Sequence, residues 1–210
     1  DVYKRQAWNC LEYVDVVGAA MKGGFIASPY NPKLAKDEMA ALINYSEATT
    51  LFVGHELIDM VSQLRAQGSL PGVKRYISLE GPAPDFVCNQ ELVSKQAGEP
   101  DVQVQEDDPF IIFYTSGTTG LPKGAVYTHR RRMENYRLKC LEMAIEQGSR
   151  HLVIIPLFHT GGDSHTWIIF YVGGCNVILP ERSFNPHSTM QAIQDYRLTD
   201  VHLSLIHISE

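Results

Sequence analysis

The fold of this chain is decided by residues 109–124, which read PFIIFYTSGTTGLPKG. The first part, Phe110 to Tyr114, is a short apolar and aromatic run that is typical of a buried strand. The second part changes abruptly to hydroxyl side chains and glycines and ends on a Pro-Lys-Gly string. Glycines let the backbone curl so that its N–H groups face an anion, and Lys123 adds a mobile positive charge. This composition predicts a loop that holds phosphate.

The string differs from the common P-loop pattern. Lys123 follows Pro122, where a P-loop has glycine, and precedes Gly124, where a P-loop has serine or threonine. Loops rich in glycine, serine and threonine also occur as plain connections between strands. Composition alone therefore leaves a phosphate site and an ordinary loop both open.

The string TSGTTGLPKG, residues 115–124, resembles the signature of the adenylate-forming superfamily. That superfamily includes acyl-CoA synthetases, coumarate-CoA ligases, luciferases and the adenylation domains of peptide synthetases. The resemblance implies that Lys123 is catalytic and that the hydroxyl of Thr115 touches magnesium. The ATP contacts it implies are Thr115, Ser116, Gly117, Thr118, Thr119, Gly120 and Lys123.

A second informative string, PLFHTGG at residues 156–162, resembles the next motif of that superfamily. By this resemblance His159 borders the carboxylate end of the substrate, and Thr160, Gly161 and Gly162 line the wall of its pocket. Without the resemblance, a lone histidine is better interpreted as a hydrogen-bonded spacer. The neighbouring Asp163 and His165 match no requirement of the motif and are interpreted as ordinary loop or helix-start positions.

Short strands alternate with helices of about ten to fifteen residues along the chain, which predicts an α/β fold whose mostly parallel sheets carry helices on both faces. The resemblance implies part of the N-terminal domain of the adenylate-forming fold. Residues 81–108 read as an exposed connection with one helical turn near 91–95. The predicted helices are 7–24, 36–46, 55–66, 128–145, 167–171 and 186–196. The predicted strands are 25–28, 50–53, 75–78, 110–114, 125–127, 151–156, 176–179 and a last one from 200.

Composition excludes several classes of protein. The chain has 210 residues, 44% of them hydrophobic, and a net charge of −6, which argues against a nucleic-acid partner. Four cysteines and eight histidines are scattered without ligand spacing on one element, so we expect neither a disulfide framework nor a zinc site. The same cysteine pattern predicts a cytoplasmic location. No apolar run is long enough for a transmembrane segment. The run Arg130-Arg131-Arg132 is interpreted as a solvated helix face rather than an anion site.

Both ends of the chain resemble translated sequencing adapters. Residues 1–6 and 204–210 are therefore predicted to be non-native, which leaves 7–202 as a partial AMP-binding (adenylation) domain. By the resemblance, later motifs follow in the family after the position of His202. They include a magnesium-binding glutamate, a ribose-binding aspartate and a catalytic lysine, so we expect this fragment alone to be inactive.

The expected activity is that of a longer enzyme, an acid-thiol ligase of the acyl-CoA synthetase type. It would convert a small-molecule carboxylic acid, a fatty acid above all or an aryl acid, with ATP and Mg²⁺ to acyl-AMP and then with CoA to acyl-CoA. Two alternatives stay open, an adenylation domain of a peptide-synthetase assembly line and a non-catalytic nucleotide-binding relative. The sequence indicates neither the acyl chain length nor the oligomeric state.

Overall fold

A computed structural model describes residues 2–6, 9–93, 98–115, 122–179 and 184–204. For residues 2–6 it describes the backbone alone. The chain divides into two compact units. The first comprises Asp1–Ala7 with Glu12–His129, and the second comprises Trp8–Leu11 with Arg130–Glu210. Among the described residues, none of the helices combines the length and apolar character needed to cross a membrane.

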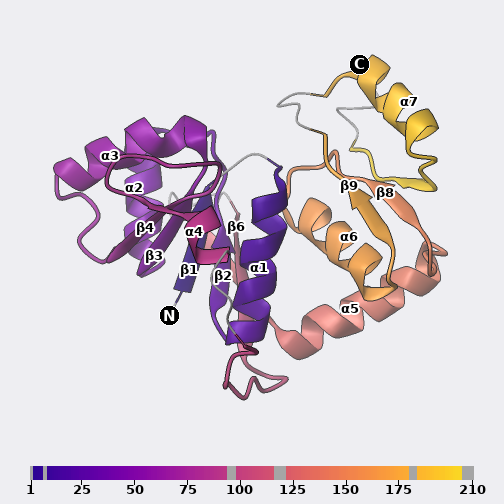
Figure 1. Ribbon diagram of the computed structural model, residues 1–210. Coiled ribbons are helices and arrows are strands. Elements are labelled where there is room, and N and C mark those ends of the chain that lie inside the picture. Colours follow the sequence, from indigo (N-terminus) through magenta and orange to yellow (C-terminus); the bar gives the residue numbers. More distant parts are fainter. Residues whose placement is uncertain (1, 7–8, 94–97, 116–121, 180–183, 205–210) are drawn as a thin grey trace. The chain divides into compact units, whose positions relative to one another are not determined.

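The first unit is built on a seven-stranded sheet in the order β5-β4-β3-β1-β2-β6-β7 (Figure 1). All neighbouring strands run parallel except β6 and β7, which are antiparallel. The mostly parallel α/β fold is thus confirmed for this unit. The strands are β1 (Val2–Gln6), β2 (Ile26–Pro29), β3 (Thr50–Val53), β4 (Arg75–Ser78), β5 (Val87–Cys88), β6 (Pro109–Thr115) and β7 (Lys123–Thr128).

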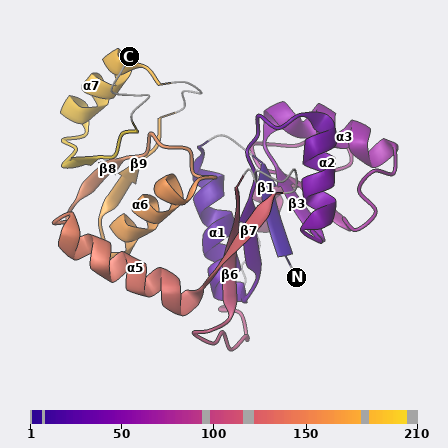
Figure 2. The ribbon, with the colours of Figure 1, turned by 180° about the vertical axis from the view of Figure 1, so that it is seen from behind.

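Helices cover both faces of this sheet. The connections β1–α1–β2 and β2–α2–β3 run in opposite directions along it, so right-handed crossovers place α1 and α2 on opposite faces. Figures 1 and 2 show α1 on one side and α2 with α3 on the other. The helical segments are α1 (Leu11–Gly23), α2 (Lys36–Tyr45), the 3-10 turn η1 (His55–Leu57), α3 (Ile58–Ala66) and α4 (Asn89–Val93).

Strand β3 shows why the sheet is buried on both faces. Leu51 and Val53 pack into the core that α2 and α3 share, with Met39 and Val61 at no measurable exposure. The alternate residue Phe52 points to the other face and is also buried. Because both faces are covered, the three consecutive residues Leu51 to Val53 are all apolar.

The second unit is smaller and has a three-stranded parallel sheet in the order β10-β8-β9. Its core includes Tyr136, Ile145, Ile168 and Ile169, which join α5 to α6. Its elements are α5 (His129–Glu142), β8 (Arg150–Leu152), α6 (Thr160–Tyr171), β9 (Cys175–Val177), α7 (Pro186–Asp195) and β10 (Asp200–Val201).

Several predicted boundaries are wrong. Helix α1 begins at Leu11 rather than at residue 7, and α6 begins at Thr160 rather than at Trp167. The connection 81–108 contains the short strand β5, which the sequence interpretation missed. At the end of α6, Phe170 and Tyr171 are 41% and 43% exposed.

Strand β1 falls within the segment 1–6 that the sequence interpretation treats as non-native. It pairs with β2 on one side and β3 on the other. Main-chain hydrogen bonds can pair strands whatever their side chains are. The foreign origin of residues 1–6 and 204–210, and with it the domain range 7–202, therefore stays a prediction.

Candidate functional site

The predicted phosphate loop connects the antiparallel strands β6 and β7. Thr115, the last residue of β6, is the register partner of Lys123, the first residue of β7, and both are exposed. The loop therefore leaves and re-enters the sheet at one place, with a hydroxyl and an ammonium group at its two ends. The other predicted ATP contacts, Ser116, Gly117, Thr118, Thr119 and Gly120, lie outside the described residues.

Close packing holds the base of this loop. A Cβ added at Gly124 would lie 3.0 Å from Ile112 Cγ2 and 3.1 Å from Tyr114 Cε1 across the strand pair. The ring of Tyr114 in turn packs against Tyr30 and Tyr45, with centroids 6.0 and 6.2 Å away. Gly124 thus allows the two strands to meet around Tyr114, next to Lys123.

His129 follows β7 and packs in the first unit. Its ring lies 5.1 Å from that of Phe110, and its main-chain N–H donates to the carbonyl of Asp108. Burial lowers the pKa of His129, although the nearby Asp108 carboxylate opposes the shift. Its Nε2 atom is buried and has no hydrogen-bond partner among the residues that the structure describes. These features fit a packed neutral ring rather than a proton-transfer group.

His159, the predicted substrate contact, lies in the second unit at the N-terminus of α6. It occupies the N-cap position with extended backbone, and its exposed ring lies 4.5 Å from Phe158. Partial burial lowers the pKa of His159, which favours the neutral imidazole. Thr160, Gly161 and Gly162, predicted to line a pocket wall, form the first turn of α6.

The two glycines of this turn differ in their surroundings. A Cβ at Gly162 would lie 2.4 Å from the carbonyl oxygen of Pro156 and 2.6 Å from that of Ile155. A Cβ at Gly161 would meet only ordinary contacts, 3.9 Å from Ile155 and 4.0 Å from His202. Gly162 therefore lets α6 approach the preceding backbone, a packing role that needs no substrate. The pocket role of all three residues stays a prediction.

Asn9 holds the segment that precedes His159, a role that the sequence interpretation missed. Its amide nitrogen donates to the carbonyl of Ile155 at 3.2 Å, and its Oδ1 accepts from the N–H of Leu157 at 2.8 Å. The partners are nearly 150 residues apart in sequence, so no local signal could have indicated this pair.

Arg132 corrects the interpretation of the arginine run. Its side chain is 3% exposed, pairs through Nη2 with Oδ2 of Asp163, and donates through Nη1 to Ser164 Oγ at 2.9 Å. Asp163, interpreted as an ordinary position, is completely buried. Burial raises the pKa of Asp163 to about 6, although the guanidinium favours the charged form. This ion pair joins α5 to the first turn of α6, where the N–H of Asp163 donates to the carbonyl of His159.

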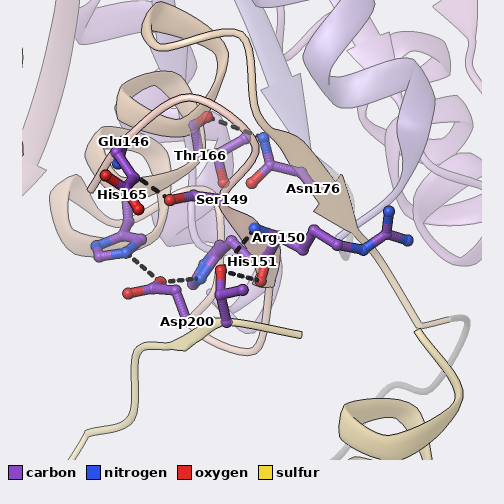
Figure 3. A network of polar contacts seen from close by, with 9 residues as sticks. Glu146, Ser149, Arg150, His151, His165, Thr166, Asn176 and Asp200 are labelled. Atoms are coloured by element: carbon purple, nitrogen blue, oxygen red, sulfur yellow. Dashed lines mark hydrogen bonds and ion pairs between the residues drawn. The ribbon is translucent and has the colours of Figure 1, made fainter. Parts of the chain in front are cut away.

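Two of the histidines described as scattered meet at one carboxylate. His151 and His165 both contact Oδ1 of Asp200, as Figure 3 shows. The sequence interpretation did not find this group, because a search for ligand spacing on one element cannot find residues from β8, α6 and β10. The expectation that the chain has no zinc site stays a prediction.

The curated proteins to which this chain is similar include two long-chain-fatty-acid–CoA ligases. The chain is 27% identical over 190 residues to a long-chain-fatty-acid–CoA ligase of Thermus thermophilus, covering 88% of this chain and 34% of that protein. It is 31% identical over 163 residues to the long-chain-fatty-acid–CoA ligase FadD13 of Mycobacterium tuberculosis, and the match covers 77% of this chain and 31% of that protein. The chain thus spans about a third of the length of these relatives.

Solved structures share the fold. The N-terminal domain of FACL13 from Mycobacterium tuberculosis matches with a TM-score of 0.86 at 25% identity, over 96% of this chain and 49% of that one. A long-chain-fatty-acid–CoA ligase from Archaeoglobus fulgidus matches with a TM-score of 0.84 at 24% identity, over 96% of this chain and 39% of that one. The sequence profile of the family described as AMP-binding enzyme matches residues 6–204. The chain therefore belongs to the AMP-binding enzyme family.

Proposed function

We propose that this chain is part of an ATP-dependent acid-thiol ligase that activates a fatty acid. The observation that carries the proposal is the register pair Thr115 and Lys123, which brings both ends of the hydroxyl-rich loop together. Membership of the AMP-binding enzyme family and the ligase names of the relatives support it. The substrates would be a small carboxylic acid, ATP and CoA.

Activation is needed because a carboxylate has no acceptable leaving group. In the proposed first step a carboxylate oxygen attacks the α-phosphorus of ATP, the bond to the β-phosphate oxygen breaks, and pyrophosphate leaves. In the second step the CoA thiol releases its proton to solvent, its sulfur attacks the acyl carbon, the bond from that carbon to the phosphate oxygen breaks, and AMP leaves. The protein has to hold two anions together despite their repulsion, a task for positioned N–H groups, hydroxyls and a cation.

Lys123 is suited to the phosphate side of this reaction. It is exposed at the first position of β7, and the tight packing of Gly124 behind it fixes where its side chain begins. Magnesium would neutralise phosphate charge when bound. Thr115 fits this ion as a source of one exposed hydroxyl oxygen, a hard ligand of the type that magnesium prefers.

The N-terminus of α6 is suited to bind the carboxylate of the acid substrate. The first N–H groups of a helix lack partners within it, and its dipole places partial positive charge there. His159 stands at this end with a lowered pKa, so its ring is neutral and can accept or donate one hydrogen bond. The chemistry of this helix end supports the proposed contact with a carboxylate.

Exchange of labelled pyrophosphate into ATP by the complete protein tests the first step. We expect Lys123→Ala to abolish most of the exchange, because the positive charge opposite the triphosphate is lost. Lys36→Ala is a matched control, since Lys36 is a partly exposed lysine on α2 whose ammonium group donates to Gln63 in the first unit. Undiminished exchange in Lys123→Ala would refute the phosphate role.

The acceptor is tested separately. We expect acyl transfer to CoA, and transfer only to a phosphopantetheinylated carrier domain would favour the assembly-line alternative. A complete protein that shows no exchange with any acid would favour the non-catalytic alternative. The cytoplasmic location stays a prediction from the cysteine pattern.

A further inference from the structure

We propose that His151, His165 and Asp200 form a binding site for a divalent transition metal of the zinc class. This site is independent of the proposed ligase function and lies entirely in the second unit. His151 Nδ1 lies 2.6 Å and His165 Nε2 lies 2.7 Å from the same oxygen, Asp200 Oδ1. Figure 3 shows the two rings converging on this carboxylate.

Three separate elements place these groups. His151 on β8 and Asp200 on β10 are register partners of neighbouring parallel strands, and His165 projects from the middle of α6. The two histidine side chains are 3% and 2% exposed, and their ring centroids lie 4.3 Å apart. A rigid sheet and a packed helix thus hold the ligands, as a preorganised metal site requires.

The donor set favours zinc-class ions over magnesium. Two imidazole nitrogens and one carboxylate oxygen are typical ligands of Zn²⁺, Co²⁺ and Ni²⁺, whereas Mg²⁺ prefers oxygen ligands alone. The three ligand atoms lie within 4.8 Å of one another. Around a tetrahedral ion they would stand ~3.4 Å apart, so each ring nitrogen has to draw back from Asp200 by less than about 1 Å.

Coordination requires both histidines to present an unprotonated ring nitrogen to the ion. On coordination each ring nitrogen uses its lone pair, and any proton that it carried moves to the other ring nitrogen or to solvent.

A fourth ligand can reach the cluster from solvent. The side chain of Asp200 is 21% exposed, which provides an entry route for an ion. The ring of His202 lies 4.9 Å from His165, and its buried Nδ1 has no hydrogen-bond partner among the described residues. A water molecule can complete the coordination.

The affinity should be lower than that of a structural zinc site. His165 would bind through Nε2, and its buried Nδ1 finds no acceptor in the part of the chain that the structure describes. A ligating histidine normally donates this second N–H to an oriented partner, which strengthens binding.

Titration with Co²⁺ of the 210-residue chain, expressed without a histidine tag, tests the proposal. We expect one ion per chain with the visible d–d absorption of four-coordinate Co²⁺, and displacement of these bands by Zn²⁺ but not by Mg²⁺. His165→Gln and Asp200→Asn should each weaken binding about tenfold or more. His187→Gln should bind as the wild type does, because that exposed side chain on α7 is outside the cluster.

Circular dichroism of each variant separates lost ligands from lost folding. If His165→Gln does not fold, the nearly isosteric Asp200→Asn provides the comparison. Absence of the bands in the folded wild-type chain overturns the proposal, whatever the variants do. So does binding that persists at full strength in both folded variants, or that His187→Gln removes equally. None of these readouts depends on adenylation activity.

Discussion

Gly162 shows how one residue can be required for packing within a motif that also suggests chemistry. We expect Gly162→Ala to lower the free energy of unfolding by about 1–3 kcal/mol, because its Cβ would overlap the carbonyl oxygens of Ile155 and Pro156. Gly161→Ala is the matched control and should cost little, since its Cβ has ordinary contacts. Urea unfolding of the two variants checks the difference, and equal losses would contradict the packing role.

His129 should make stability depend on pH. Its folded-state pKa is lowered, so just below its ordinary pKa the unfolded chain binds a proton that the folded chain does not. The contribution of His129 is therefore present above that ordinary pKa of about 6.5 and is lost as pH falls through the folded-state value.

The variant His129→Phe isolates this effect, because it keeps a ring against Phe110 but cannot titrate. We expect the unfolding free energy of the wild type, relative to this variant, to rise as the pH increases toward about 6.5 and then to level off. Chemical unfolding at a series of pH values checks it. Parallel curves for the two proteins would contradict the assignment.

At the scale of elements, the ion pair of Arg132 and Asp163 connects α5 to α6. Asp163→Asn should cost about 3–5 kcal/mol, because it leaves the buried guanidinium without its counter-ion. The control is Glu134→Gln on α5, whose partner Arg131 is 74% exposed. That exposed pair should contribute less than about 1 kcal/mol.

Thermal and urea unfolding of both variants measure these costs. A small effect of Asp163→Asn would show that the pair is dispensable for folding. If the variant instead unfolds completely, replacing Arg132 and Asp163 together by apolar residues should recover stability, since removing both charges avoids the unpaired one.

At the scale of the whole molecule, the chain covers about a third of the relatives it matches. We expect the 210-residue chain alone to give only background pyrophosphate exchange, because the predicted magnesium-binding glutamate, ribose-binding aspartate and catalytic lysine of the family follow its last motif. The complete protein assayed beside it is the control. Exchange by the chain alone at the rate of the complete protein would contradict this prediction.

Much of the fold could be predicted from local patterns. Strands β3 and β4 have the predicted bounds, and the alternation of strands and helices correctly indicated a mostly parallel α/β fold. The string at 115–124 identified the family. The features that a phosphate-binding loop needs, namely flexible glycines, hydroxyl groups and one lysine, all lie within these ten residues. The roles of Ser116 to Gly120 stay predictions.

The sequence by itself thus determined the class of fold, the family and the two strings that suggest adenylation. Only the tertiary structure decided that Arg132 is buried, that Gly162 meets backbone, and that His151 and His165 share the carboxylate of Asp200. The physical reason is distance along the chain: His151 and His165 are 49 and 35 residues from Asp200. Helix and strand periodicities act over a few residues, whereas burial and pairing of charges depend on which distant elements pack together.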